Sequence, residues 1–201
     1  MVIAGIALED DRVDELWRIG VKDSKKLAQK ERERLADEIK KLVDAWVVEV
    51  LDAWEVDSMT RRRGREGINI LEARVFSEII KKLRPEKAYI DLPSRNADEY
   101  ERLLKGMGYR CRLILEHKAD EKYAVVAAAS ILAKVERDRH VERLRNELGD
   151  FGSGYPSDPK TLQFLRELAE RGRLDERVVR LSWRTLEKVL QRRLDEYGEE
   201  P

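Results

Sequence analysis

Short apolar segments alternate with longer segments of helical periodicity along most of this chain, and this alternation constrains the fold more than any other feature. The segments that predict strands are residues 2–8, 47–51, 87–93 and 110–116. The segments that predict helices are residues 23–42, 70–80, 97–107 and 123–148. Such alternation is typical of an α/β fold, in which helices cover the faces of a sheet. We therefore predict an α/β domain over residues 1–150.

Three local signals set the expected helix boundaries. Asp23 or Ser24 is a suitable N-cap for the helix that comes after it. The run Arg61–Arg65 interrupts the apolar periodicity, so the next helix is expected to begin after it and to end before Pro85. The small residues Ala127–Ser130 in the last predicted helix favour close packing on a sheet.

The end of the chain has a different pattern. A turn-rich segment at residues 152–159 is followed by two predicted helices, residues 159–171 and 178–194, with no strand between them. We predict a helical C-terminal subdomain over residues 151–201.

Composition excludes some classes of protein and leaves others open. The 201 residues include 41 basic and 41 acidic side chains, so net charge argues neither for nor against nucleic acid binding. Cys111 is the single cysteine, which excludes an intramolecular disulfide and predicts a reducing, cytoplasmic compartment. No apolar run is long enough to span a bilayer, and no signal peptide is recognisable. We expect a monomer that does not bind membranes.

Two acidic residues come directly after predicted strands and are candidates for chemistry. Asp91 ends an apolar strand, where it either caps the next turn or serves a function. Asp120 lies just beyond the next strand, where it either caps the long helix or serves a function. If the two strands are parallel neighbours, both carboxylates lie at one edge of the sheet. Two oxygen ligands there would suit Mg²⁺ or Mn²⁺.

Several other residues are candidates for contacts with phosphate or sugar. Lys25 and Lys26 lie beside a predicted helix start, and Lys118 lies beside Asp120, although each is also explained as a solvated charge. Tyr155 lies in a loop rich in glycine and proline. Its ring either stacks on a sugar or base or is buried and anchors the loop. Four basic residues of the predicted tail helix recur at a spacing that places them on one face: Arg177, Arg180, Arg184 and Lys188. They either contact a nucleic acid backbone or form ion pairs within the helix. Trp183 is expected to be a core residue.

Zinc chemistry and nucleophile-triad catalysis gain no support. His117 and His140 have no partner at metal-ligand spacing, and no serine or cysteine has a nearby base.

Taken together and in order, these residues resemble the ribonuclease HII family, in particular its archaeal members. The resemblance rests on four blocks: Val21–Leu27; Tyr89–Asp91; Glu116–Asp120 running into Ala127–Val135; and Gly152–Thr161. It implies a ribonuclease H-like mixed sheet flanked by helices, with a small C-terminal helical subdomain. It also implies an endonuclease that cleaves the RNA strand of RNA–DNA hybrids and single ribonucleotides in duplex DNA, using Mg²⁺ or Mn²⁺.

The resemblance assigns roles to individual residues. Asp91 and Asp120 match two of the four metal-binding catalytic carboxylates of the family. Tyr155 matches a tyrosine that packs on the deoxyribose beside the ribonucleotide, and Lys25 and Lys26 match phosphate-contacting positions. The implied reaction is hydrolysis of a phosphodiester that leaves 5′-phosphate and 3′-hydroxyl ends.

The sequence departs from the family at its start. The family's first strand ends in an Asp-Glu-Ala-Gly-Arg-Gly segment that supplies the other two carboxylates, and this sequence contains no such segment. Residues 1–26 instead match the family's second strand and the segment directly after that strand, so we expect a sheet without the first strand. Two alternatives to an active nuclease therefore stay open. One is an impaired family member that only binds hybrid or duplex nucleic acid, and the other is an unrelated α/β protein that binds a small phosphate ligand.

Overall fold

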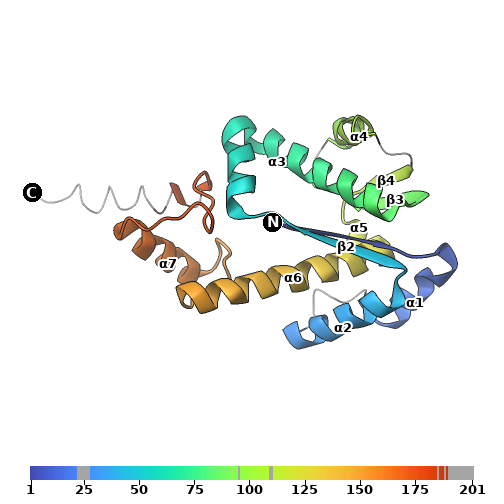
Figure 1. The fold of residues 1–201 in the computed structure, drawn as a ribbon, viewed down its shortest axis with the longest axis horizontal. Coiled ribbons are helices and arrows are strands. Elements are labelled where there is room, and N and C mark those ends of the chain that lie inside the picture. Colours follow the sequence, from blue (N-terminus) through green and yellow to red (C-terminus); the bar gives the residue numbers. More distant parts are fainter. Residues whose placement is uncertain (22–27, 95, 109–110, 185, 188, 190–201) are drawn as a thin grey trace, which may run out of the picture. The chain divides into compact units, whose positions relative to one another are not determined.

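The computed structural model describes residues 1–21, 28–94, 96–108, 111–184, 186–187 and 189 (Figure 1). The chain forms two compact units. The first unit comprises Met1, Leu51–Gly67 and Asp138–Pro201, and the second comprises Val2–Val50 and Ile68–Arg137. The division at residue 150 stays a prediction. Among the described helices, none has the length and apolar character needed to cross a membrane.

The strands of the second unit form two pairs. β1 (Val2–Ala7) pairs with β2 (Ala45–Val50) in antiparallel register, and β3 (Lys87–Asp91) pairs with β4 (Arg112–Glu116) in parallel register. In the parallel pair, Asp91 is the register partner of Glu116. Strands and helices therefore alternate as predicted, and the α/β class is confirmed.

Helices pack around these strand pairs. The helices that lie wholly in the second unit are η1 (Asp10–Arg12), α1 (Val13–Arg18), α2 (Gln29–Leu42), α4 (Ala97–Lys105) and α5 (Ala119–Lys122). The second unit also contains the later part of α3 (Ala53–Leu83) and the earlier part of α6 (Ala124–Leu148). The predicted caps Asp23 and Ser24 lie outside the described residues.

The small residues of α6 allow the close packing that the sequence predicted. Ala127 and Ala128 are buried in one cluster with Leu35 and Ile39 of α2. Partly buried residues of β1 and β2 pack against the same cluster. The helix α6 thus contacts both a helix and the sheet.

The predicted interruption at Arg61–Arg65 contains a non-helical residue, Gly64, but the helical segment that precedes it was not predicted. Helix α3 begins at Ala53 and continues through the arginines, with a kink at Gly64, where φ is 58° and ψ is −137°. Its start is fixed by a capping box, because Asp52 accepts a hydrogen bond from the N–H of Glu55 while Glu55 accepts one from the N–H of Asp52. Arginine has high helix propensity, so the exposed residues Arg61–Arg63 favour a helix even though they carry no apolar periodicity.

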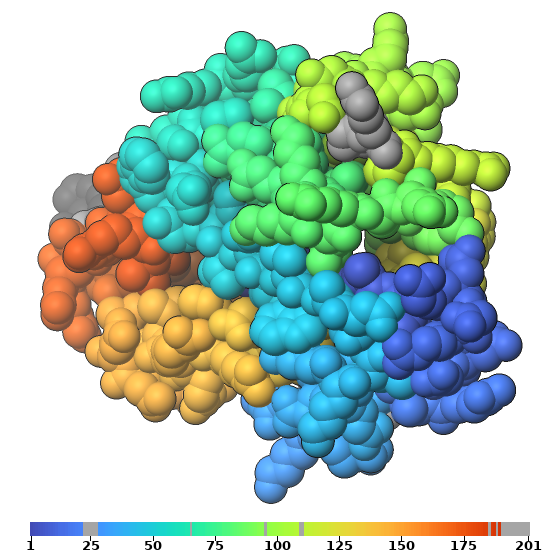
Figure 2. All heavy atoms as spheres, turned by 45° about the vertical axis from the view of Figure 1, so that its right-hand side comes forward, coloured from blue at the N-terminus to red at the C-terminus, as the bar shows by residue number. Residues whose placement is uncertain are grey.

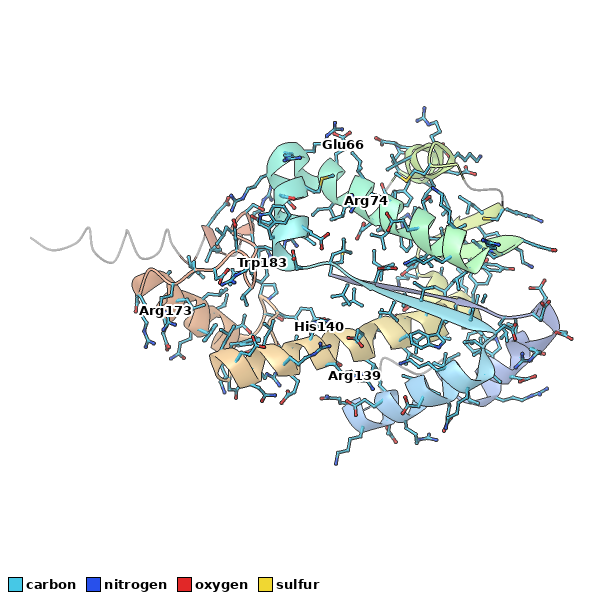
Figure 3. The ribbon with its side chains drawn as sticks, viewed as in Figure 1. Glu66, Arg74, Arg139, His140, Arg173 and Trp183 are labelled. Carbon is cyan, nitrogen blue, oxygen red and sulfur yellow. The ribbon has the colours of Figure 1, made fainter. Side chains whose placement is uncertain are left out.

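The first unit contains α7 (Pro159–Glu170), which Asp158 caps by accepting a hydrogen bond from the N–H of Lys160. The second predicted tail helix was expected from residue 178, but residues 178–183 form turns and bends. Trp183, labelled in Figure 3, packs against Leu165, Val179 and Leu186. Trp183 is thus partly buried against this cluster and is not one of the cluster's buried residues.

Candidate active site at the ends of β3 and β4

The candidate site is built where β3 and β4 end side by side. Because the two strands are parallel and in register, Asp91 and Glu116 reach the same edge of the sheet. The chain then turns through Lys118 into α5, whose first two residues are Ala119 and Asp120. The N–H of Ala119 donates a hydrogen bond of 3.1 Å to Oδ1 of Asp91. This bond brings the backbone next to Asp120 against the Asp91 carboxylate.

The turn at Lys118 is conformationally costly. Lys118 adopts the left-handed conformation, with φ 55° and ψ 39°, which a residue with a Cβ rarely adopts. Strained backbone of this kind is found preferentially at functional sites. The Lys118 side chain is exposed, so its charge is available to an anion.

Both simple capping interpretations need correction. Asp91 does accept a capping hydrogen bond, but the donor is the first N–H of α5, which comes after the next strand. It is not an N–H of the turn directly after Asp91. Asp120 is not the N-cap of the long helix, because it lies inside α5 and α6 begins only at Ala124. Neither residue is thus explained by the local turn or helix that its sequence position suggested.

Glu116 and Tyr123 belong to this edge and were not singled out as site residues from the sequence. Lys122 and Tyr123 both donate hydrogen bonds to the Glu116 carboxylate, the phenol at 2.5 Å. These bonds, that of Lys122 first, lower the pKa of Glu116. The Tyr123 ring lies against that of Tyr89, with 4.5 Å between centroids. The available signal was that Glu116 ends the strand next to the one ended by Asp91.

Tyr155 lies in the first unit, in the loop before α7. The loop is held by hydrogen bonds from the N–H of Ser153 to Asp158 (2.6 Å) and from the N–H of Gly154 to Thr161 (3.0 Å). Tyr155 is 52% exposed. The interpretation as a buried loop anchor was therefore wrong, and the exposed alternative stands.

The remaining candidates are the lysines predicted to contact phosphate and the basic residues predicted to share one helical face. Lys25, Lys26 and Lys188 lie outside the described residues. The expected stripe of basic residues on one helical face is not formed by Arg177 and Arg180, because both precede the helical residues. Arg177 pairs with Asp175, and Arg180 donates a hydrogen bond of 3.3 Å to Thr60.

The chemistry available at the edge is that of oxygen donors. Within the described part of the chain, no group of three or more His, Cys, Asp or Glu side chains is placed to hold a metal ion. Asp91 and Asp120 offer two carboxylates, and the first is oriented by the hydrogen bond from Ala119 to its Oδ1. Two carboxylates and an exposed lysine are suited to a hard cation together with a phosphate.

Comparison with known proteins gives one consistent result. The sequence matches the family model described as "Ribonuclease HII" over residues 1–186. It is 44% identical over 197 residues to the ribonuclease HII of Archaeoglobus fulgidus, covering 98% of this chain and 92% of that protein.

Solved structures agree. The fold is similar to a chain in "Structure of the PCNA:RNase HII complex from Archaeoglobus fulgidus", with a TM-score of 0.85 and 43% identity, covering 97% of this chain and 91% of that one. It is also similar to the ribonuclease H2 of Pyrococcus horikoshii, with a TM-score of 0.82 and 35% identity, covering 96% and 98%.

Proposed function

Since the chain belongs to the ribonuclease HII family of endoribonucleases, we propose that it cleaves the RNA strand of RNA–DNA hybrids and single ribonucleotides in duplex DNA. The proposed reaction is metal-assisted hydrolysis that leaves 5′-phosphate and 3′-hydroxyl ends. The observation that carries this proposal is the hydrogen bond to the Asp91 carboxylate from the N–H of Ala119, the residue directly before Asp120.

The two aspartates fit a divalent cation. Oδ2 of Asp91 is not used in the hydrogen bond to Ala119 and remains available as a ligand. Carboxylate oxygens are the ligands that Mg²⁺ and Mn²⁺ prefer. We assign Asp91 and Asp120 as the residues that hold the ion. When bound there, Mg²⁺ or Mn²⁺ would supply positive charge to a phosphate under attack and favour the ionised form of a nearby water.

Residues of this chain orient the proposed metal ligand Asp91 and would position the substrate. The hydrogen bond from Ala119 fixes the Asp91 carboxylate at the strand end, and the register with Glu116 fixes the strand end itself. We assign the exposed Lys118 to bind a backbone phosphate by charge. Tyr155 is assigned to the sugar beside the scissile bond, and Lys25 and Lys26 to further phosphates, on the strength of the family resemblance.

A second candidate function has its own support. The described residues hold no cluster of three or more possible metal ligands, which favours a protein that binds hybrid duplexes without cleaving them. The two functions share a nucleic acid ligand and differ only in catalysis. The single cysteine, Cys111, which forms no disulfide, supports a cytoplasmic location for either.

A cleavage assay separates the two. The full chain of residues 1–201 is incubated with an end-labelled RNA–DNA hybrid in Mg²⁺, in Mn²⁺ and in a chelator. We expect metal-dependent cleavage that Asp91→Asn reduces more than about 100-fold. Substitution of residues that only hydrogen-bond to a metal's ligands already lowers metal affinity or activity by about 10–100-fold, and a direct ligand should matter more. Asp98→Asn, an exposed acid on α4, is the matched control and should cleave normally. Tight hybrid binding without any metal-dependent cleavage would instead establish the second candidate.

A further inference from the structure

The strand β2 of the second unit has an edge without a strand partner. Among the described residues, β2 pairs with β1 and with no other strand. No residue of β2 is buried, and in Figure 2 the light-blue part of the chain that includes β2 lies on the visible surface. An unpaired edge presents a row of N–H and C=O groups that readily pair with another strand. The outer edge of β2, meaning the edge away from β1, is therefore open to a partner.

The hydrogen-bond ladder determines which residues of β2 face this outer edge. Directly beyond the two strands, Leu51 and Met1 exchange two main-chain hydrogen bonds, at 2.8 and 2.6 Å. Such pairs alternate along an antiparallel ladder, so Glu49 and Val47 also direct their N–H and C=O groups toward β1. The residues that alternate with them direct these groups to the outer edge: Trp46, Val48 and Val50.

These three residues also share one face of the sheet. Side chains alternate along a strand, so all three point to the face on which Val48 packs against the cluster that contains α2 residues. Trp46 and Val50 are 44% and 42% exposed. Within the described part of the second unit, no other large apolar side chain is exposed. The exposed large apolar side chains of this unit thus lie together on one strand.

The strand lacks the features that usually protect an edge. Natural edge strands are blunted by lysine, by proline, by a bulge or by short length. β2 has the sequence Ala-Trp-Val-Val-Glu-Val, and its register with β1 is unbroken from Ala45 to Val50. Its charged residue, Glu49, lies on the opposite face, where it pairs with Lys82 of α3 at 2.5 Å. The outer edge is therefore suited to pairing and is not protected against it.

The spacing of the exposed residues favours a second copy of this chain as the partner. Trp46 and Val50 lie two residues before and two residues after Val48. If two β2 strands meet antiparallel about a two-fold axis at Val48, Trp46 of each copy lies directly opposite Val50 of the other. In this register alone, all three outward-facing residues pair with one another, and each pair exchanges two hydrogen bonds. An aromatic side chain opposite a β-branched one is also a favourable cross-strand pair.

We propose that β2 is a dimerisation edge, through which two copies of this chain pair antiparallel about Val48. The two-fold axis uses the same edge on both copies, so the pairing closes at two copies and does not extend into a fibre. This inference does not rest on the proposed nuclease function. It replaces the monomer that the sequence predicted, and the two alternatives are separated by experiment.

The first test uses the unchanged full chain, without metal or nucleic acid. In sedimentation velocity over a dilution series, we expect an equilibrium between the 23.5 kDa chain and a species of twice that mass. Amide hydrogen exchange of Trp46, Val48 and Val50, followed by NMR, should slow at least about tenfold where the dimer is populated. Exchange of Val47 and Glu49 should change little, because their N–H groups already bond to β1.

Variants at the two exposed positions test the register. Trp46→Glu and Val50→Lys should each raise the dissociation constant of the dimer at least about tenfold, because a charge replaces an apolar group at both symmetric contacts. A mixture of the two variants should dimerise more tightly than either variant alone. In the mixed dimer, one introduced carboxylate lies opposite one introduced ammonium, and the other contact is unchanged. Leu148→Lys, which removes an exposed apolar side chain from the end of α6, is the matched control and should dimerise normally.

Three results would overturn the proposal. They are a 23.5 kDa species at every concentration, a dimer whose dissociation constant Val50→Lys leaves unchanged, and a mixture of variants that dimerises no better than each alone. The first would confirm the predicted monomer. The exchange measurement uses the unchanged protein, so it does not depend on the folding of any variant. None of these results bears on metal-dependent cleavage, so the dimer and the proposed nuclease function fail separately.

Discussion

The carboxylate of Asp91 accepts a hydrogen bond from the backbone N–H of Ala119 at 3.1 Å, across a sequence separation of 28 residues. This bond links the end of β3 to the first turn of α5, the helix that carries Asp120. It explains how two acidic residues far apart in the sequence come to share one edge of the sheet.

Mg²⁺ or Mn²⁺ should stabilise the protein through Asp91 and Asp120. A ligand that binds only the folded state at 100 times its dissociation constant adds about 2.7 kcal/mol to the free energy of unfolding. We expect the midpoint temperature of thermal unfolding to rise when the metal is added to the unchanged protein. Adding the metal to Asp91→Asn should not raise its midpoint temperature. Asp98→Asn should respond as the unchanged protein does. A full metal response in Asp91→Asn would remove this residue from the metal site.

Tyr155 should contribute to hybrid binding through its ring rather than its hydroxyl. Tyr155 is 52% exposed on a loop held by Asp158 and Thr161. Loss of an aromatic stacking contact costs about 1–3 kcal/mol, so Tyr155→Ala should weaken hybrid affinity by roughly 5- to 150-fold. Tyr155→Phe should bind nearly normally in the same fluorescence-anisotropy titration. Equal losses in both variants would assign the role to the hydroxyl instead.

Glu72 on α3 should make the protein less stable as the pH rises. Burial raises its pKa to about 7 from an unfolded value of 4.5. The folded protein therefore holds a proton that the unfolded chain releases between these two values, and the free energy of unfolding falls across that window. The shift corresponds to about 3 kcal/mol at most.

Urea unfolding at pH 4.5 and pH 8 checks this prediction. Glu72→Gln should reduce the loss of stability between the two pH values, whereas Glu66→Gln, exposed on the same helix (Figure 3), should leave it unchanged. An identical pH dependence in Glu72→Gln and the unchanged protein would contradict the prediction.

Asp57 should stabilise the first unit in its ionised form. It is 2% exposed and accepts hydrogen bonds from the N–H and hydroxyl of Ser182, at 2.7 and 2.6 Å, and it pairs with Arg61 at 2.7 Å. Burial opposes ionisation, but the Ser182 hydrogen bonds and the Arg61 charge outweigh it and lower the pKa of Asp57 below 3.8.

This stability is present above pH 3.8 and is lost as the pH falls through the lowered pKa of the folded state. Asp57→Asn should lower the free energy of unfolding at pH 7 by about 2 kcal/mol, through the loss of charged hydrogen bonds. Asp37→Asn, an exposed acid on α2, should change it little. Equal stability of both variants in urea at pH 7 would exclude this role for Asp57.

Gly64 should be needed for the kink in α3. Its φ of 58° and ψ of −137° lie in a region that residues with a Cβ avoid, so Gly64→Ala should cost about 1–3 kcal/mol of stability. Gly106→Ala is the matched control, since Gly106 has a right-handed helical φ of −64° and alanine there should be neutral or slightly stabilising. If both variants unfold at the same urea concentration, the kink does not depend on glycine.

Local signals determined most of the secondary structure. Apolar runs at residues 2–8 and 87–93 became β1 and β3, and Pro85 comes shortly after the end of α3, because these patterns act through neighbouring residues. The helical segment before Gly64 was missed because an exposed helix shows little apolar periodicity. The capping box of Asp52 and Glu55 was the sequence signal that could have predicted its start. The tail was predicted least well, since residues 178–183 are shaped by contacts such as that between Asp57 and Ser182.

The sequence by itself determined the family, the α/β class and the residue types at the candidate site, because motifs and periodicity are properties of the chain's own order. Only the tertiary structure decided that Asp91 bonds to the N–H of Ala119 rather than to its own turn. Only the tertiary structure, too, left one edge of β2 without a strand partner among the described residues. Strand pairing joins residues far apart in the sequence, and its partners depend on which edges meet in space, which no local pattern encodes.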